Sequence, residues 1–266
     1  AGWGADTFGM VQAHLKVGKG DLLFVQAEVT RLAERDSSAA ILARNALSTM
    51  LTDSTRAFAR PYAGLPARKT RPIPGENLFP ISLRSAANAA FADQAADDRK
   101  GAWNDQGPQN DLKAFPVGDR EFGGTRYSVV DPKENNGLAC VAVSGRPNSH
   151  LPRESRPVPV NAKLRRIQFL HPSAWTPPRG RRIGCYIVRY SDGKEREIPL
   201  VTGVNIDDWW GAPGKVLKQA ECLWSSGGSQ CIVGVFGFDW INPEPERKVE
   251  SVRLRLEDAA VVALCA

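Results

Sequence analysis

The chain has 266 residues, of which 42% are hydrophobic and 24% are charged, a composition typical of soluble globular proteins. No apolar run approaches the roughly 20 residues that a membrane-spanning helix needs, so the sequence predicts no membrane partner. The formal net charge is +6, and a positive surface of this kind attracts polyanions such as nucleic acid or acidic polysaccharide.

Residues 1–55 have the character of a partial α/β segment. They open without a basic n-region or an apolar h-region, so no secretory signal is visible. The apolar run "DLLFVQAEV" at 21–29 predicts a buried strand, and the spacing of apolar residues predicts a helix over 38–51. One strand and one helix cannot form an α/β domain, so we expect this segment to dock on the following domain or to be the tail of a truncated one.

Residues 56–77 are rich in proline and arginine and lack periodicity, which predicts an extended connector. From residue 78 to residue 266 strand signals prevail. The predicted strands are 137–143, 163–170, 182–190, 196–200, 231–240 and 248–257. Asp192 and Gly193 predict a hairpin turn between two of them. Short strands with turn signals and no helices between them predict a mainly β domain, a β-sandwich or jelly roll.

Positive charge is concentrated between Arg146 and Glu197, a segment that contains twelve basic and four acidic residues. This local excess is larger than that of the whole chain. One interpretation is a surface for sulfated or carboxylated polysaccharide, and the other, which we favour, is a solvated charged face. Nucleic acid is disfavoured as a partner because no helix-turn-helix, zinc-finger or RNP-type pattern accompanies the arginines.

The cysteines do not indicate a metal centre or a cofactor. None of the five belongs to a C-x-x-C pair, so a zinc site is unsupported. Cys140 and Cys185 lie in strand-like runs and are predicted to behave as small buried hydrophobes. Cys222 and Cys231 flank "LWSSGGSQ" and could bridge a hairpin.

The stretch 92–112 gathers acidic and amide side chains in a glycine-bearing loop, for which three interpretations stay open. Carboxylates on a loop can collect a hard cation such as a structural Ca²⁺. The candidate Ca²⁺ ligands are Asp93, Asp97 and Asp98. Beside an indole, the same groups can bind sugar hydroxyls, and the candidate residues are Trp103, Asp105, Asn110 and Asp111. The third interpretation is a loop whose side chains hydrogen-bond its own backbone.

The stretch "GVNIDDWW" at 203–210 places two carboxylates before two indoles. Neighbouring residues of an extended chain face opposite sides, so Asp207 and Asp208 cannot form the pair that glycoside hydrolases hold across roughly 5 to 10 Å. For the same reason only one of the two tryptophans can be a sugar platform. Asp208 and Trp209 are the candidate carbohydrate-binding residues, and the alternative is a packed corner of a β-sandwich.

No catalytic residue is predicted. None of the three histidines, His14, His150 and His171, lies in a G-x-S-x-G or H-E-x-x-H context. The enzyme alternative is a compact hydrolase that combines the acids of 97–111 with Asp207 or Asp208.

Several motifs together resemble a known family. They are "NLFPISLRSAANAAFAD", "DDRKGAWNDQGPQNDLKAFPVGDREFGGTRYSVVDPKENNG", "LRRIQFLHPSAW", "YIVRYSDGKEREIPLVTGVNIDDWW" and "WINPEPERKVESVRL". Over residues 78–266 the chain resembles galactose-binding-like jelly-roll modules appended to large bacterial glycoside hydrolases of the β-galactosidase-like kind. The N-terminal "GKGDLLFVQAEVTRLAERDSSAAILARNALSTML" is similar to the last strand and helix of their glutamine-amidotransferase-like domain, without the nucleophilic cysteine of true amidotransferases.

This resemblance implies a non-catalytic C-terminal accessory region that supports a glycoside hydrolase or targets it to an oligo- or polysaccharide. The implied partners are a carbohydrate, anionic if the basic segment takes part, and an upstream catalytic domain of the same protein. Homo-oligomer formation stays open, and a secreted or periplasmic location is expected from the family. The alternatives are a structural or oligomerisation module without a ligand, and a self-contained glycosidase that uses the loop acids.

Overall fold

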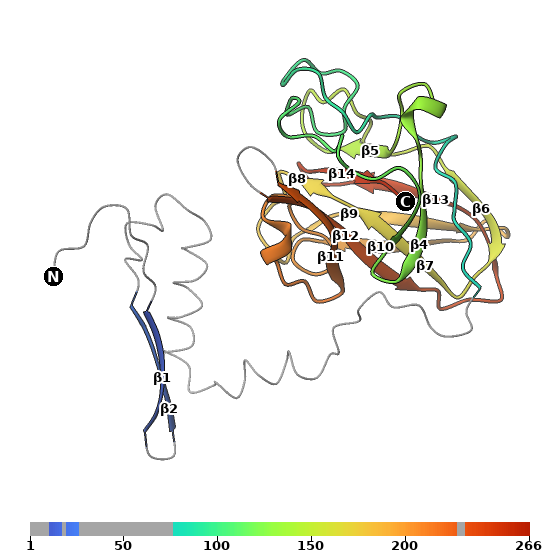
Figure 1. Cartoon of the computed structure of the whole chain (residues 1–266). Helices are drawn as coiled ribbons and strands as arrows, with labels where there is room; N and C mark the ends of the chain where they lie inside the picture. The colour runs from blue at the N-terminus through green and yellow to red at the C-terminus, as the bar shows by residue number, and fades with distance from the viewer. Residues whose placement is uncertain (1–10, 18–19, 27–76, 228–231) are drawn as a thin grey trace. The chain divides into compact units, whose positions relative to one another are not determined.

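The computed structural model describes residues 11–17, 20–26, 77–227 and 232–266, and it divides the chain into two compact units, Ala1–Pro66 and Ala67–Ala266. In the first unit β1 (Val11–Val17) and β2 (Gly20–Gln26) form an antiparallel hairpin (Figure 1). β2 overlaps the predicted strand 21–29, but it pairs with a strand that the sequence analysis did not predict. The predicted helix over 38–51 and the connector up to residue 76 lie outside the described residues.

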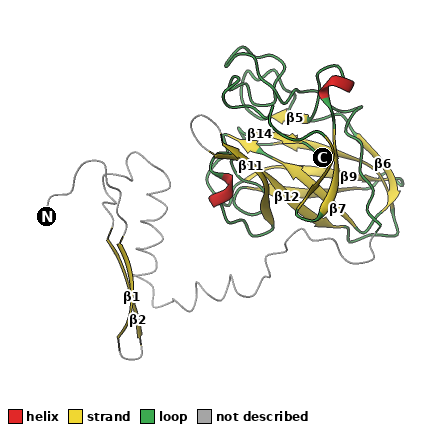
Figure 2. Ribbon diagram, viewed as in Figure 1, coloured by secondary structure: helices red, strands yellow, loops and turns green. Residues whose placement is uncertain are grey.

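Residues 77–266 are mainly β, as predicted, with two short 3₁₀ turns (Figure 2). The strands are β3 (Gly118–Phe122), β4 (Thr125–Val129), β5 (Val141–Ser144), β6 (Val158–Lys163), β7 (Arg166–His171), β8 (Ser173–Ala174), β9 (Arg182–Tyr190), β10 (Glu195–Val201), β11 (Ala220–Gly227), β12 (Ile232–Ile241), β13 (Lys248–Leu256) and β14 (Val261–Leu264). The 3₁₀ turns are η1 (Pro132–Glu134) and η2 (Ala212–Gly214). Among the described residues no helix is long and apolar enough to cross a membrane.

The strands of this unit form antiparallel sheets that stack as a β-sandwich. One sheet has the order β10-β9-β13-β6, and a second has the order β11-β12-β7. The second sheet continues sideways into β14 and β5, because the Leu170 N–H donates to the Ala266 carbonyl at 2.8 Å and the Cys265 N–H donates to the Leu170 carbonyl at 2.8 Å. We call this continuous surface, from β11 through β7 and β14 to β5, the central sheet.

The central sheet is buried on both faces. In β14, Val262 and Leu264 belong to the hydrophobic cluster shared with β9, β10 and β13, whereas Val261 and Ala263 belong to a second cluster. In β5, Val141 and Val143 belong to the first cluster and Ala142 belongs to the second. Neighbouring residues of a strand point to opposite faces, so two-sided burial requires an uninterrupted apolar run rather than an alternating one.

The second cluster lies beneath a layer made of the loops at 85–117 and the β3–β4 hairpin, which we call the loop layer. Its contributions to the cluster are large apolar side chains: Phe91, Trp103, Leu112, Phe115, Phe122 and Tyr127. Trp103 meets Trp209 edge to face, with ring centroids 5.0 Å apart. Such a pair adds about 0.5 to 1.5 kcal/mol beyond the area it buries. The loop layer is therefore part of the folded core, although it contains few strands.

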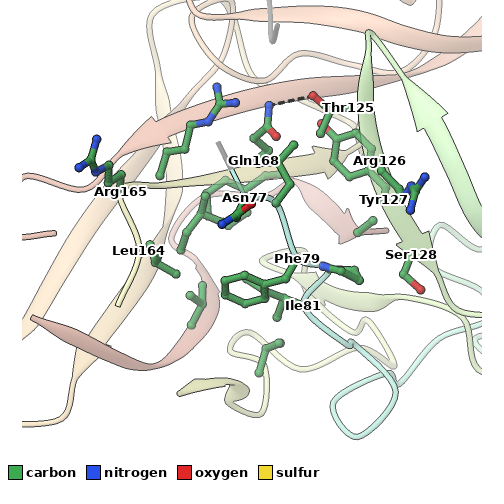
Figure 3. A pocket seen from close by; sticks show the side chains of 18 of the residues that line it. Asn77, Phe79, Ile81, Thr125, Arg126, Tyr127, Ser128, Leu164, Arg165 and Gln168 are labelled. Carbon is green, nitrogen blue, oxygen red and sulfur yellow. Dashed lines mark hydrogen bonds between the residues drawn. The ribbon is translucent and has the colours of Figure 1, made fainter. Parts of the chain in front are cut away.

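A cavity of about 490 Å³ opens at the edge of the sandwich between residues 77–83, β4 and the start of β7 (Figure 3). Its deep wall consists of core residues of three strands, Phe169, Val252 and Leu264, and its mouth carries the exposed Leu78 and Phe79.

The predicted strand signals are confirmed both in the half-buried β13 and in β9, which is buried on both faces. β9 spans the predicted residues 182–190, and β13 buries Val252 and Leu254 while Arg253 and Arg255 are half-exposed. The predicted hairpin turn joins β9 to β10, with Gly193 at φ +84° and the Lys194 N–H bonded to the Asp192 Oδ1 at 3.1 Å. Glycine is suited to this position because it lacks the Cβ that penalises positive φ.

Close packing between β9 and β13 makes one glycine indispensable. A Cβ on Gly184 would lie 2.1 Å from the Arg255 carbonyl oxygen, which belongs to the neighbouring strand and cannot yield without breaking the ladder. We expect Gly184→Ala to lower the free energy of unfolding by about 2 to 3 kcal/mol. Gly214→Ala is the matched control, because no atom lies within 4 Å of the added methyl group. Urea-induced unfolding measures both, and equal midpoints would contradict the packing described.

Candidate functional site

The segment from 89 to 112 crosses the second face of the central sheet and returns on itself. The Ala90 N–H donates to the Gly101 carbonyl at 2.7 Å, and the Leu112 N–H donates to the Phe91 carbonyl at 2.9 Å. These bonds close the acidic stretch 92–111 into a compact loop whose ends are pinned to the core. The loop acids are therefore held on a fixed backbone.

Three loops at this end of the sandwich enclose a cavity of about 180 Å³. They are the acidic loop, the β5–β6 connection and the turn after β8. The lining residues are Asp97, Arg99, Trp103, Asn104, Asp105, Arg146, Pro147, Asn148, Ser149, His150, Leu151, Trp175 and Val261. The His150 Nε2 lies 3.0 Å from the Ala102 carbonyl oxygen and joins two of the loops. We call this space the loop cavity.

Backbone strain is concentrated around the loop cavity. Seven non-glycine residues in the described ranges have positive φ, and five of them line this cavity. The five are Asp97, Arg99, Asp105, Asn148 and Trp175. Positive φ is unusual for any side chain with a Cβ and is a genuine outlier for one as bulky as tryptophan. Strained residues of this kind tend to gather at binding sites and persist only where the surrounding structure imposes them.

Polar groups and an indole line the same space. The half-buried Trp175 carries the Arg146 guanidinium over its ring, with the Arg146 Cζ 3.8 Å from the ring centroid. The Asn104 Oδ1 and the Trp103 Nε1 are buried with no hydrogen-bond partner among the described residues. A buried polar atom without a partner costs free energy, so each is suited to a polar ligand or an ordered water.

Three loop carboxylates converge beside the cavity. Asp93, Asp98 and Asp105 each place one oxygen within 4.8 Å of the other two. Oxygens that share a Ca²⁺ at about 2.4 Å lie no further apart than this, so the three side chains fit a hard cation. The predicted ligand set contained Asp97 in place of Asp105, and Asp97 instead lies exposed on the cavity wall.

The loop carboxylates also hydrogen-bond the loop backbone, as the third interpretation of the sequence expects. The Asp93 Oδ2 accepts from the Gly107 N–H at 2.6 Å, and the Asp105 Oδ1 accepts from the N–H groups of Asp98 and Arg99 at 3.1 and 3.2 Å. The Asp111 Oδ2 accepts from the Asp93 N–H at 3.1 Å. These bonds hold the carboxylates in place, and each oxygen keeps lone-pair capacity for a further partner.

The structure separates the predicted carbohydrate residues. Trp103 and Asp105 line the loop cavity, whereas Asn110, Asp111, Asp208 and Trp209 do not. Trp103 and Trp209 are fully buried against each other, so neither exposes a face on which a sugar ring can stack. This burial corrects their assignment as platforms. The residues missed by the sequence analysis are Arg146, Asn148 and Trp175, which gave only a turn signal and an isolated indole before a Thr-Pro-Pro run.

The side chains at 207–210, in the corner at 203–210, alternate between buried and half-buried positions, as expected. Trp209 is buried and Trp210 is half-buried. Asp207 is bound by Arg179 at 3.1 Å and by Lys215 at 3.2 Å, so its charge is already neutralised. Asp208 accepts hydrogen bonds from the backbone of Trp210, and burial raises its pKa above the ordinary value for aspartate. Both carboxylates hold the corner together, in agreement with the packed-corner interpretation.

A buried histidine fastens this corner to the central sheet. His171 is fully buried, with its Nδ1 2.8 Å from the Tyr186 hydroxyl and its Nε2 3.0 Å from the Asn205 carbonyl oxygen. A carbonyl only accepts, so Nε2 carries the proton and Nδ1 accepts from the tyrosine. Burial lowers the pKa of His171 to about 4, and the imidazole is neutral near pH 7.

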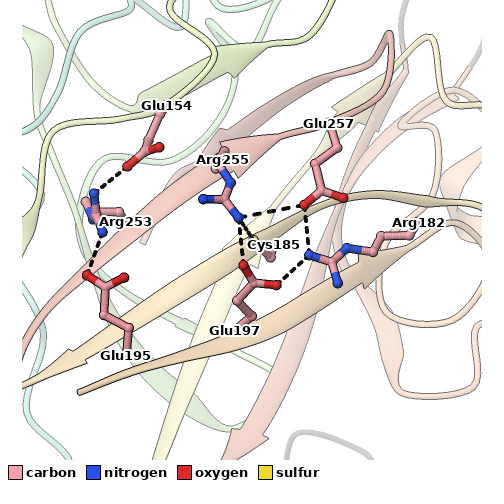
Figure 4. A network of polar contacts seen from close by, with 8 residues as sticks. All are labelled: Glu154, Arg182, Cys185, Glu195, Glu197, Arg253, Arg255 and Glu257. Atoms are coloured by element: carbon pink, nitrogen blue, oxygen red, sulfur yellow. Dashed lines mark hydrogen bonds and ion pairs between the residues drawn. The ribbon is translucent and has the colours of Figure 1, made fainter.

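The basic segment is largely neutralised by its own acids and by acids from later parts of the chain (Figure 4). Arg182 bridges Glu197 at 2.7 Å and Glu257 at 2.8 Å, and Arg255 joins Glu197 at 2.6 Å. Of the twelve basic residues, seven have acidic partners in the described part of the chain: Lys163, Arg166, Arg179, Arg181, Arg182, Arg189 and Arg196. The hydrogen bond from Arg182 lowers the pKa of Glu197. This outer face is thus a mixed ionic surface rather than a positive one.

Cys185 lies beneath these ion pairs, close enough to Glu197 and Glu257 to resemble a metal cluster. Two guanidiniums already satisfy both carboxylates, and burial raises the pKa of the Cys185 thiol, so it is protonated and a weak ligand. Cys140, Cys185 and Cys265 are buried free thiols, as predicted for the first two. Cys231, one half of the bridge considered above, lies outside the described residues.

No protein-family model matches the sequence, and no curated protein is significantly similar to it.

The carboxylate cluster predicts stabilisation by Ca²⁺. A hundred-fold excess of Ca²⁺ over its Kd should raise the Tm by about 5 to 10 °C, because the ion binds the folded loop and not the unfolded chain. Asp105→Asn should abolish this rise, whereas Asp97→Asn, outside the cluster, should retain it. Thermal unfolding with CaCl₂ or with EDTA tests this. A Tm that does not change when Ca²⁺ is added, or that rises equally in both variants, would refute the cation site.

The buried His171 predicts acid sensitivity. Its folded pKa of about 4 lies below the unfolded value near 6.5, so between these pH values the unfolded chain binds a proton that the folded chain does not. The stabilisation from neutral His171 is complete above the unfolded pKa and is lost as the pH falls, at about 1.4 kcal/mol per pH unit within that window.

Urea unfolding at pH 7.5 and pH 5 measures this loss. In the His171→Gln variant the free energy of unfolding should change less between these two pH values. In the His150→Gln variant, which replaces an exposed histidine, it should change as much as in the wild type. If His171→Gln does not fold, NMR titration of the wild-type imidazole replaces it, and a pKa near 6.5 would contradict the structure.

Proposed function

We propose that residues 78–266 form a non-catalytic carbohydrate-binding module and that the loop cavity is its ligand site. The observation that carries this proposal is the convergence of five non-glycine residues with positive φ on one cavity. Aspartate and asparagine tolerate this conformation, but at Arg99 and Trp175 it is costly, and a fold that retains such strain at one place is best explained by a function of that place.

The chemistry of the cavity favours a saccharide. A saccharide presents a rim of hydroxyl groups, and the cavity offers polar groups around the Arg146 guanidinium, which is stacked on the half-buried Trp175 indole. The Arg146 guanidinium supplies N–H donors next to that ring, while Asp105 and Asn148 supply acceptors. The buried Asn104 Oδ1 accepts from no described donor and can take a hydroxyl hydrogen.

Catalysis by the acids of this unit is disfavoured by their contacts. Asp207 is held between two cations, and Asp208 caps backbone N–H groups of its own corner. The loop acids Asp93, Asp98 and Asp105 face one another rather than a second acid across the cavity. A glycosidase mechanism needs two carboxyl groups on opposite sides of the scissile bond, and neither group of acids provides that geometry.

The proposal extends to the parent protein through the sequence resemblance. The motifs that resemble galactose-binding-like modules support an accessory role beside a glycoside hydrolase, with the carboxylate cluster as a structural Ca²⁺ site. The anionic class of polysaccharide has less support than the sequence suggested, because the outer face of the sandwich carries paired charges.

The test is binding of the full chain to an array of neutral and acidic glycans, followed by calorimetry with the best ligand. We expect Trp175→Ala to weaken binding by about ten-fold or more, because the indole that holds the Arg146 guanidinium in the cavity is lost. Trp210→Ala removes another half-buried indole outside the cavity and should leave the affinity unchanged.

Equal affinities of the two variants, or no glycan retained by the wild type, would refute the site. Hydrolysis of a bound glycan by the chain alone would refute the non-catalytic assignment. Circular dichroism of both variants confirms that they are folded before their affinities are compared.

A further inference from the structure

The edge cavity between residues 77–83, β4 and β7 is distinct from the loop cavity, with which it shares no lining residue. Its volume of about 490 Å³ falls within the range of small-molecule sites, which are concave, mostly apolar and furnished with a few polar groups. Figure 3 shows that its walls come from three separate segments, with Phe79 and Ile81 from one, Tyr127 from another and Arg165 from the third.

The larger part of the edge cavity's lining is apolar, and polar side chains are interspersed along its wall. The deep wall exposes core side chains of the sandwich, among them Phe169, Val252 and Leu264. At the mouth Leu78 and Phe79 are 42% and 52% exposed, unusual for side chains of this size. Apolar surface in this arrangement favours the burial of a hydrocarbon chain or ring, at about 25 cal/mol per Å² removed from water.

The rim of the edge cavity is positive. Arg126 and Arg165 are exposed there, and within the described ranges neither has an ion-pair partner. The acidic side chain of the wall, Glu246, is paired with Lys163 at 3.5 Å. Two guanidiniums above an apolar wall match a ligand that carries an acidic head on an apolar body.

A buried donor adds a second polar feature. The Tyr127 side chain is 4% exposed, and its hydroxyl has no hydrogen-bond partner in the described part of the chain. Burial and the neighbouring Asp239 carboxylate raise the pKa of Tyr127, so the hydroxyl stays protonated and able to donate. The Gln168 Nε2 donates to the Thr125 Oγ1 at 3.1 Å, so those two groups of the wall satisfy each other (Figure 3).

We propose that the edge cavity is a second binding site and that it takes a small amphipathic anion, an alkyl or aryl body with one acidic head group. The body lies against Phe79 and the core wall, and the head is bound by one of the two arginines, Arg126 or Arg165, which stand on opposite sides of the cavity (Figure 3). This site is independent of saccharide binding at the loop cavity, because no residue is shared between them.

The probe is decanoate below its micelle concentration, with 1-decanol as a neutral probe of the same chain length. Calorimetry on the full chain should show saturable one-to-one binding of decanoate and at least about ten-fold weaker binding of decanol, because the alcohol lacks the charge that the arginines bind. Near-UV circular dichroism with and without decanoate establishes that the chain stays native.

The variants separate the head group from the body. One of Arg126→Glu and Arg165→Glu, the variant of the arginine that binds the head, should weaken decanoate binding by about ten-fold or more, and both should leave decanol binding unaffected. Arg120→Glu, an exposed arginine of β3 outside the cavity, is the matched control and should change neither affinity. Phe79→Ala should weaken both probes, because it removes part of the apolar wall.

Three results would overturn the proposal. The first is an absence of saturable decanoate binding, and the second is decanoate binding in both Arg126→Glu and Arg165→Glu that equals the binding in Arg120→Glu. The third is a dimer in sedimentation analysis that Phe79→Ala converts to a monomer, because the apolar mouth would then be an interface between copies of the chain.

Discussion

The burial of the central sheet on both faces is the constraint on which the rest of the unit depends. A β-sandwich needs only one covered face on each sheet, but here the second face of β5, β7 and β14 also excludes water. The loop layer provides that cover through Phe91, Trp103 and Leu112, and the Trp103–Trp209 contact fastens it to the corner at 203–210. A loop that must supply core side chains cannot move freely, and the acidic groups it carries acquire fixed positions.

Fixed loops explain how strain and charge can accumulate at one end of the molecule. Positive φ at Asp97, Asp105 and Trp175 persists because the surrounding packing imposes it. Three carboxylates at mutual distances within 4.8 Å repel one another, and the backbone N–H groups bound to them compensate only in part. On the opposite sheet the charges are arranged differently, since arginines and glutamates alternate across β9, β10 and β13 and pair with one another (Figure 4). One face thus stabilises its own charges, while the loop end retains groups that a ligand can use.

The sequence predicted those features that a single strand or turn encodes. The alternation in β13 and the Asp192–Gly193 turn are local signals, and both were read correctly. β14 was missed although it is an uninterrupted apolar run like β5, and the β3–β4 hairpin was missed although Gly123 and Gly124 signal its turn. Only part of the lining of the loop cavity could be predicted from the sequence. The acidic loop stands out in the sequence, but Arg146 and Trp175 reach it through long-range pairing of β5, β8 and β14, which no local pattern reveals. The neutralisation of the basic segment was hidden for the same reason, because its partner acids, apart from Glu195 beside Arg189, lie 15 to 83 residues away.

The central claim is that a saccharide binds at the loop cavity and contacts Trp175. The most direct measurement is the indole N–H region of the ¹H–¹⁵N NMR spectrum of the full chain, recorded during titration with galactose and with galacturonate. We expect the Trp175 signal to shift progressively with one of these sugars, while the signal of the buried Trp209 shifts less and that of Trp240 stays in place. Indole signals that do not move at saturating sugar, or shifts at Trp240 without a shift at Trp175, would contradict the account.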